Sequence, residues 1–201
     1  QSSSERLIEV AARNLAHAVA TDNTSEANVD PIERITLERL ARVAELHVAN
    51  VTGLSTSMTG RGLTVLPVTR GHWAQRTLED YRPLLEKLAG SLGAADTDDD
   101  PDGPDDPFGG PDDQLAAMLG PMIQAMQPMM VAMTAGSMVG HLARRSLGQY
   151  DLPVPRPPSD ELVILVRNLD EFVSGWSLPA DDLLLWICLH EIAHHAVLGV
   201  P

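Results

Sequence analysis

The stretch that decides the fold is Leu183–Leu198, LLLWICLHEIAHHAVL, near the end of the sequence. Apart from four polar residues in its middle, it is apolar around the whole circumference of a helix. A helix that is hydrophobic on all sides is a buried helix. The stretch therefore predicts a central, buried helix, with Ser177 as its N-cap and Pro179 in its first turn.

Within this helix, residues 190–194 form the motif HExxH. Residues four apart lie on the same face of a helix, so His190 and His194 can direct two imidazoles at one Zn²⁺. Glu191 then lies beside them, where it can polarise a zinc-bound water. Burying two histidines and a glutamate costs free energy unless a partner satisfies them, and a metal does so. The motif predicts His190 and His194 as zinc ligands and Glu191 as the catalytic base; the alternative is a helix with two unrelated histidines.

The motif leaves the third zinc ligand open. A catalytic zinc takes three protein ligands and a water. The metzincin continuation requires a glycine and a histidine where this sequence has Val197 and Val200, which excludes that class. His195 is turned about 100° from His194, so we expect it to face a neighbouring helix or solvent. We expect the third ligand beyond Pro201, in a longer protein; an upstream ligand is the alternative.

The amino-acid composition indicates what fills the core, which partners are excluded and which compartment is favoured. The 201 residues are 44% hydrophobic but only 3% aromatic, so aliphatic residues and Met must fill the core. A net charge of −14 argues against nucleic-acid binding and against anionic membrane surfaces. The single cysteine, Cys188, offers no disulfide and favours a reducing, cytoplasmic compartment. Nothing in the sequence indicates the oligomeric state.

Three regions are predicted: an N-terminal helical region at 1–93, an acidic Asp/Pro/Gly linker at 94–113, and a C-terminal region at 114–201. The linker contains nine of the aspartates, between Asp96 and Asp113. The C-terminal region combines Met-rich helices, a short strand and the HExxH helix. The fold class is mainly α with a minor β part.

Hydrophobic periodicity and breaker residues predict the other elements. Helices are expected at 5–20, from Asp30 to about Asn50, and at 72–92 with a bend near Pro83. A helical pair is expected at 115–147, broken at Pro121 and Pro128. The apolar side of the first helix is expected to consist of Leu7, Ile8, Ala11, Leu15 and Val19. In the last pair, the spacing of Gly136 and Gly140 fits close helix packing in a core as well as a membrane hairpin. Interrupting glutamines and the scarcity of Ile and Phe favour the core.

Short β-type runs are expected at 63–68 and 161–167. Pro67 confines the first run to an edge strand or an extended loop. The second run, ELVILVR, either holds an extended substrate or only packs the HExxH helix. Asn168 is expected to cap the short helix that follows.

The segment 178–201, with its sequence LPADD, the apolar LLLWICL run and HExxHH, resembles a known family. It is similar to the zincin-like hydrolases found mainly in actinobacteria, long carried as a domain of unknown function and known as zinc-dependent metalloproteases. One branch of the family is associated with deazaflavin coenzyme biosynthesis. The resemblance covers the chain from about Thr36 onward and is sharpest at Ser137–Pro201. It implies a mostly helical zincin-like fold, a metal site and a substantial further C-terminal part.

These features lead to two hypotheses of different class. The first is a zinc metallopeptidase, in which Glu191 takes a proton from a metal-activated water that attacks a peptide carbonyl. The second is a non-catalytic zincin scaffold that binds a partner or serves as a regulatory module, with the Met-rich helices as its surface. A hydrolase of non-peptide amides is a third alternative. For the first hypothesis, Tyr150 and His141 are the nearest candidates to stabilise an oxyanion.

Overall fold

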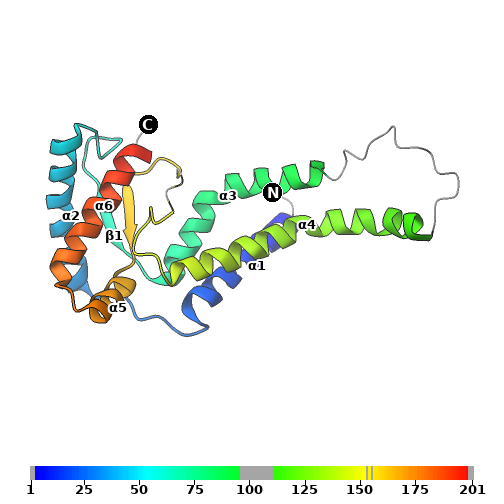
Figure 1. Ribbon diagram of the computed structural model, residues 1–201, viewed down its shortest axis with the longest axis horizontal. Coiled ribbons are helices and arrows are strands. Elements are labelled where there is room, and N and C mark those ends of the chain that lie inside the picture. Colours follow the sequence, from blue (N-terminus) through cyan, green and yellow to red (C-terminus); the bar gives the residue numbers. More distant parts are fainter. Residues whose placement is uncertain (1–2, 96–110, 153, 155, 199–201) are drawn as a thin grey trace.

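The computed structural model describes residues 3–95, 111–152, 154 and 156–198, without side-chain detail at 92–95 and 111–124 (Figure 1). Within these residues the structure is mainly α with a minor β part, as expected. The elements follow the order α1 (Ser3–Thr21), α2 (Pro31–Thr52), β1 (Thr64–Pro67), α3 (Arg70–Ala95), α4 (Pro111–Ala143), β2 (Glu161–Ile164), α5 (Val166–Trp176) and α6 (Ala180–Leu198). Most of the predicted linker, residues 96–110, lies outside the described residues.

The two strands form a small parallel sheet that separates two hydrophobic clusters. Thr64 of β1 pairs with Glu161 of β2, and the register continues to the ends of both strands. Successive residues of a strand point to opposite faces. Accordingly, Leu162 and Ile164 belong to one cluster, while Val163 and the following residue Leu165 belong to the other.

Each cluster lies under a different group of helices. The first cluster lies between α2 and α6, which run side by side on one face of the sheet (Figure 1). The second cluster lies among α1, α3 and α4. Beyond it, the ends of α3 and α4 extend away from the body as an arm (Figure 1). The HExxH helix, α6, thus packs with α2 on one face of the sheet. The strand β2 contributes residues both to this cluster and to the cluster among α1, α3 and α4.

The ends of α2 follow directly from its sequence. The carboxylate of Asp30 accepts a hydrogen bond from the N–H of Ile32 at 2.8 Å, and Glu33 accepts one from the N–H of Asp30 at 3.2 Å. This is a capping box, which satisfies N–H groups that have no partner inside the helix. At the other end, Gly53 has φ 68°, a left-handed conformation that favours glycine. Both predicted ends of this helix are confirmed.

The expectation for the fourth helix is wrong, and that for the first helix holds only in part. The expected pair at 115–147 is a single helix, α4, which continues through Pro121 and Pro128. On α1, Leu7 is 68% exposed, but the other four residues of the expected apolar side are partly buried, and the completely buried residues lie beside them, centred on Ala16. The small residues Gly136 and Gly140 of α4 lie against Ala12 and Ala16, which centres the buried side of α1 on its alanines. The packing of α4 along α1 and α3 offsets the loss of single hydrogen bonds at proline.

Small residues bring α1 and α4 close together. A Cβ atom at Gly136 would lie 2.6 Å from the carbonyl oxygen of Ala12, and one at Gly140 would lie 2.7 Å from that of Ala16. Only a residue without a side chain fits at such distances from backbone. The predicted close helix packing is therefore confirmed. Among the described residues, no helix is long and apolar enough to cross a membrane.

Gly136→Ala is expected to destabilise the fold by about 1–3 kcal/mol, because the added methyl group would push the backbone of α1 away. Gly90→Ala is the matched control, since nothing lies within 4 Å of a Cβ at that position of α3. The control should stabilise by about 0.5–1 kcal/mol, the ordinary gain of alanine over glycine in a helix. Urea unfolding of both variants measures the difference, and equal stabilities would contradict this account of the contact.

The boundaries between β2, α5 and α6 also differ from expectation. The strand ends at Ile164 instead of residue 167, and α5 begins at Val166. Asn168 lies inside α5, where it does not cap that helix. Its buried amide instead donates to the carbonyl oxygens of Ala143 and Ser146, at and just after the end of α4. Ser177, with φ 53°, ends α5 and is not the N-cap of α6. Both residues therefore donate to carbonyl oxygens at the end of a helix, where the last carbonyl groups have no partner inside the helix.

Candidate metal and catalytic site

The HExxH motif lies in the second half of α6, and the helix is buried as predicted. Ile187, Cys188 and Ile192 are buried in the cluster under α2. Burial raises the pKa of the Cys188 thiol to about 12, so this free cysteine stays neutral. Trp186 is more than half exposed and stacks on the ring of His190, with centroids 5.3 Å apart. One flank of the motif therefore faces the core and the other reaches the surface.

The rings of His190 and His194 lie next to each other, with centroids 4.3 Å apart and planes at 71°. Nδ1 of His194 lies 3.1 Å from the carbonyl oxygen of His190. Because a carbonyl oxygen only accepts, this Nδ1 carries the proton, and the lone pair of the neutral ring is on Nε2. Nδ1 of His190 lies 3.3 Å from Oε1 of Glu191, so this ring too is held through Nδ1. Both Nε2 atoms are thereby left to bind a metal.

The donors present fit a zinc ion in type and in tautomer. Neutral imidazoles are among the commonest zinc ligands, and their other ring nitrogen is normally held by a carbonyl or carboxylate, as here. In the part of the chain that the structure describes, no group of three or more His, Cys, Asp or Glu side chains could hold a metal. The two predicted ligands therefore lie together, and the third ligand stays a prediction.

Glu191 is almost completely buried, with 1% of its surface exposed. Its Oε2 accepts a hydrogen bond from the backbone N–H of Tyr150 at 2.6 Å. Burial raises the pKa of Glu191 to about 7 and outweighs the hydrogen bond, which lowers it. A carboxyl group with a pKa near neutrality is suited to accept and return a proton.

The loop 147–151 covers this carboxylate. The carbonyl oxygen of Gly148 accepts the indole N–H of Trp73 at 2.9 Å, and that of Leu147 accepts the N–H of Leu165 at 2.9 Å. Asp151 accepts from the N–H groups of Leu147 and Gly148. These bonds fix the loop from α3, from the end of β2 and from within.

At Gly148 the loop comes so close to Glu191 that no side chain fits. A Cβ there would lie 2.6 Å from both Cγ and Oε2 of Glu191. Gly148→Ala should therefore displace the carboxylate and destabilise the protein by about 1–3 kcal/mol. Gly175→Ala in α5 is the matched control, because nothing lies within 4 Å of a Cβ there. Unfolding curves of the two variants test this, and a Gly148→Ala protein as stable as its control would refute the contact.

His195 does not face solvent, which was one of the two expectations for it. It is buried, and its Nδ1 lies 3.0 Å from the hydroxyl of Tyr150. Burial lowers the pKa of His195. The hydroxyl of Tyr150, a candidate to stabilise an oxyanion, is thus engaged inside the protein. The other candidate, His141, is exposed in the last turn of α4.

The strand β2 packs the core, the second of the two roles considered for it. One edge pairs with β1. On the other edge, Gly148 forms an antiparallel bridge with Ile164, and the side chain of Gln149 accepts the N–H of Val163 at 3.3 Å. With both edges in use, the described strand has no free edge along which an extended peptide could pair.

Sequence reasoning missed the groups that hold Glu191. Gly148 and the N–H of Tyr150 contact it directly, and Trp73 and Arg156 hold the loop that carries them. A weak signal was available: with three Trp and two Tyr in the whole chain, each such residue outside the apolar helix is a candidate for a specific buried contact.

A mainly helical fold with HExxH on a buried helix is the arrangement expected of the class of zincin-like proteins. The sequence profile of a family described as zincin-like metallopeptidase matches residues 9–199. The chain therefore belongs to the zincin-like metallopeptidase family.

A solved structure also resembles the chain. It is described as "a putative hydrolase with a novel fold", from Chloroflexus aurantiacus, and has a TM-score of 0.59 at 18% identity. The match covers 95% of this chain and 52% of the other, so the chain spans about half the length of that neighbour. At this identity the likeness concerns the fold alone. No curated protein matches the chain.

Proposed function

We propose that the protein is a zinc-dependent hydrolase that cleaves peptide bonds. The observation that carries this proposal is the placing of two adjacent imidazoles, both with Nε2 available, beside the buried carboxyl group of Glu191. Membership of the zincin-like metallopeptidase family supports the same chemistry.

In this proposal each residue has a separate task. His190 and His194 hold the metal through Nε2, and their Nδ1 atoms keep the rings in the required tautomer. When bound, zinc supplies Lewis acidity, which polarises a carbonyl group and lowers the pKa of water. Glu191 takes a proton from the attacking water and returns it to the leaving amine.

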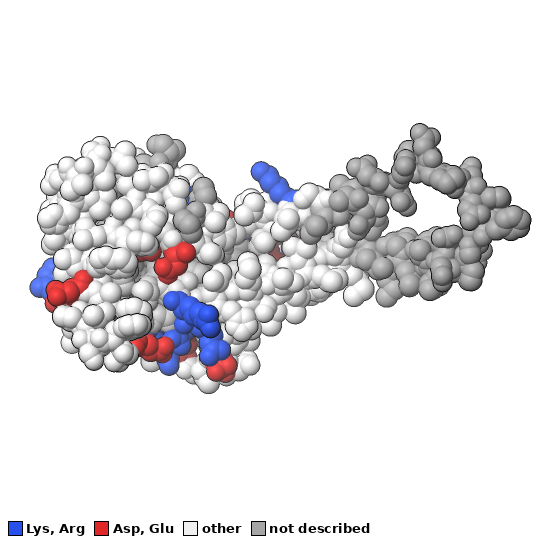
Figure 2. All heavy atoms as spheres, viewed as in Figure 1, with Lys and Arg blue, Asp and Glu red and all other residues white. Residues whose placement is uncertain are grey.

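The substrate is proposed to be a peptide or protein, and nucleic acid is not expected as a partner. The face shown in Figure 2 has no broad basic surface: its basic side chains lie beside acidic ones, and large areas carry neither. Several of the arginines form ion pairs within the protein, such as Arg39 with Asp181 and Arg82 with Glu86. A phosphate backbone requires unpaired, clustered cations.

The second candidate function is a non-catalytic zincin scaffold. It is favoured by the lack, among the described residues, of a third side chain that would complete the metal site. On this reading the two histidines bind metal weakly or only structurally.

Metal analysis combined with digestion of a mixed peptide library separates the two functions. The hydrolase should contain about one zinc per chain, cleave peptides, and lose cleavage on treatment with a chelator. Recovery of cleavage on adding zinc back excludes a contaminating serine protease. A protein that binds zinc and cleaves nothing would favour the scaffold, and one that binds no zinc would refute the proposal.

A further inference from the structure

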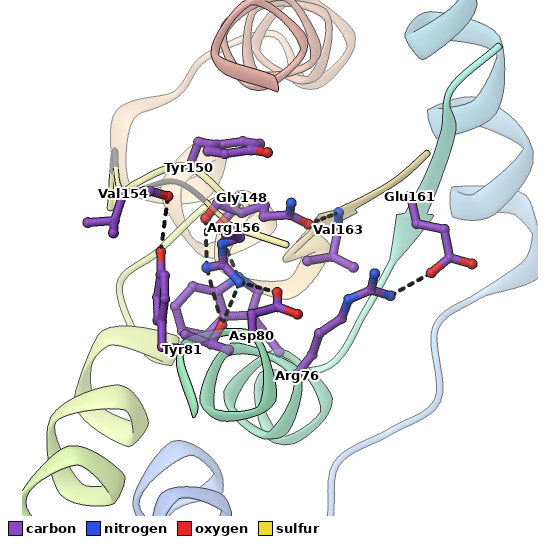
Figure 3. A network of polar contacts seen from close by, with 12 residues as sticks. Arg76, Asp80, Tyr81, Gly148, Tyr150, Val154, Arg156, Glu161 and Val163 are labelled. Atoms are coloured by element: carbon purple, nitrogen blue, oxygen red, sulfur yellow. Dashed lines mark hydrogen bonds and ion pairs between the residues drawn. The ribbon is translucent and has the colours of Figure 1, made fainter. Parts of the chain in front are cut away.

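Arg156 is a buried cation that the proposed mechanism does not use. Its side chain is 1% exposed. It forms an ion pair with Asp80 at 2.8 Å, and its guanidinium carbon lies 4.8 Å from the ring centroid of Tyr81 (Figure 3). Nη2 donates to the carbonyl oxygen of Gln149 at 2.9 Å. Its Nε has no hydrogen-bond partner among the described residues.

Stability alone gives no reason for this arrangement. Taking a guanidinium out of water costs several kcal/mol, and a well-packed apolar side chain of similar volume is often as stable or more so. Here the ion pair is made with a single carboxylate, that of Asp80, whose own side chain is 20% exposed. Among the polar contacts of Arg156, the bond to the carbonyl oxygen of Gln149 is the one that reaches the loop over Glu191.

The bond to Gln149 leads directly to Glu191. The carbonyl of Gln149 and the N–H of Tyr150 are two ends of one peptide group, which is planar and, like all described peptide bonds, trans. Arg156 donates to its oxygen at 2.9 Å, and its N–H donates to Oε2 of Glu191 at 2.6 Å. A cation at the oxygen end polarises the group and strengthens the hydrogen bond at the other end. It also fixes the orientation of the N–H.

We propose that Arg156 is a positioning residue for Glu191, which it orients through the single peptide group between Gln149 and Tyr150. The helix α3 is the rigid support: Asp80 and Thr77 hold the guanidinium, and Trp73 holds the neighbouring carbonyl of Gly148. The role in catalysis rests on the proposed function, whereas the coupling between Arg156 and the N–H of Tyr150 does not.

The test follows the amide proton of Tyr150 by NMR in the whole chain. Labelling with [¹³C′]Gln and [¹⁵N]Tyr identifies this amide, because only one of the two tyrosines follows a glutamine. The matched control is Arg76→Met: Arg76 lies on α3 next to Thr77 and binds Glu161 at 2.7 Å, and the structure shows no bond from it to the 147–151 loop (Figure 3). Arg156→Met should move the Tyr150 amide proton upfield, and Arg76→Met should leave it in place.

Kinetics provide the second measurement. In Arg156→Met, kcat should fall about 10- to 100-fold with KM nearly unchanged, a loss typical of supporting residues around a metal site. Arg156→Lys, which keeps the charge, should recover part of both the amide shift and kcat. Arg76→Met should change neither kcat nor the amide shift.

An unchanged Tyr150 amide signal in folded Arg156→Met overturns the proposal. Should that variant not fold, Arg156→Gln takes its place, since it removes the cation that donates to the carbonyl oxygen of Gln149 but keeps a polar side chain beside Asp80. An upfield shift supports the coupling, and no shift refutes it. The amide signal requires neither metal nor turnover. A wild-type protein without hydrolysis would therefore refute the proposed function, while the NMR result would still decide on Arg156.

Discussion

Glu191→Gln is expected to keep the bound metal and to lose hydrolysis by about 10²- to 10⁴-fold, the usual contribution of a general acid–base group. The amide side chain has the shape of the carboxyl group, and its oxygen can still accept the N–H of Tyr150, so the 147–151 loop should stay in place. It cannot accept a proton from water. The change therefore removes proton transfer while it preserves packing.

Zinc content, unfolding and steady-state kinetics of Glu191→Gln distinguish this from a folding defect. The matched control is Glu86→Gln, the same change at an exposed residue of α3 that pairs with Arg82. The control should retain full activity. Full activity in Glu191→Gln itself would refute the assignment of the general base, and loss of zinc together with activity would indicate that Glu191 supports the ligands instead.

Replacing either histidine of the motif is the second large effect that we expect. Zinc sites with four ligands bind with about 10–16 kcal/mol, so one ligand contributes about 3 kcal/mol, or about 100-fold in affinity. His190→Ala and His194→Ala should each weaken zinc binding by about this factor and abolish hydrolysis at low zinc concentration. Competition with a zinc-binding dye measures the affinity.

His141→Ala is the control for both variants, because His141 is exposed in the last turn of α4. It should bind zinc as the unchanged protein does. His194 also lies near Tyr150, with ring centroids 6.4 Å apart, so its replacement could also change the stability of the fold. Unfolding curves of the variants separate such a loss of stability from a loss of zinc affinity. Unchanged zinc affinity in either His190→Ala or His194→Ala would remove that residue from the site.

The 147–151 loop links the site to the rest of the molecule. It covers Glu191 on the α6 side and is held by Trp73 and Arg156 on the other. The strand β2 lies between the two hydrophobic clusters and has one face toward each of them. The geometry of the carboxylate therefore depends on helices that are distant from the motif in sequence.

Features that depend on neighbouring residues could be predicted from the sequence. The apolar run around HExxH indicated a buried helix, and the spacing of His190 and His194 put them on one face. Asp30 and Gly53 indicated both ends of α2. In each case the physical cause, helical periodicity or a cap, acts over four residues or fewer.

Only the tertiary structure decided what surrounds the motif. The bonds from Tyr150 to Glu191, from Trp73 to Gly148 and from Arg156 to Asp80 join residues 41, 75 and 76 positions apart. The same holds for α4, which continues as one helix through its prolines and packs along both α1 and α3. Local sequence sets which helices form and which side chains share a face. The burial that sets the pKa of Glu191 arises only when segments far apart in the chain pack together, because burial is a property of the assembled core.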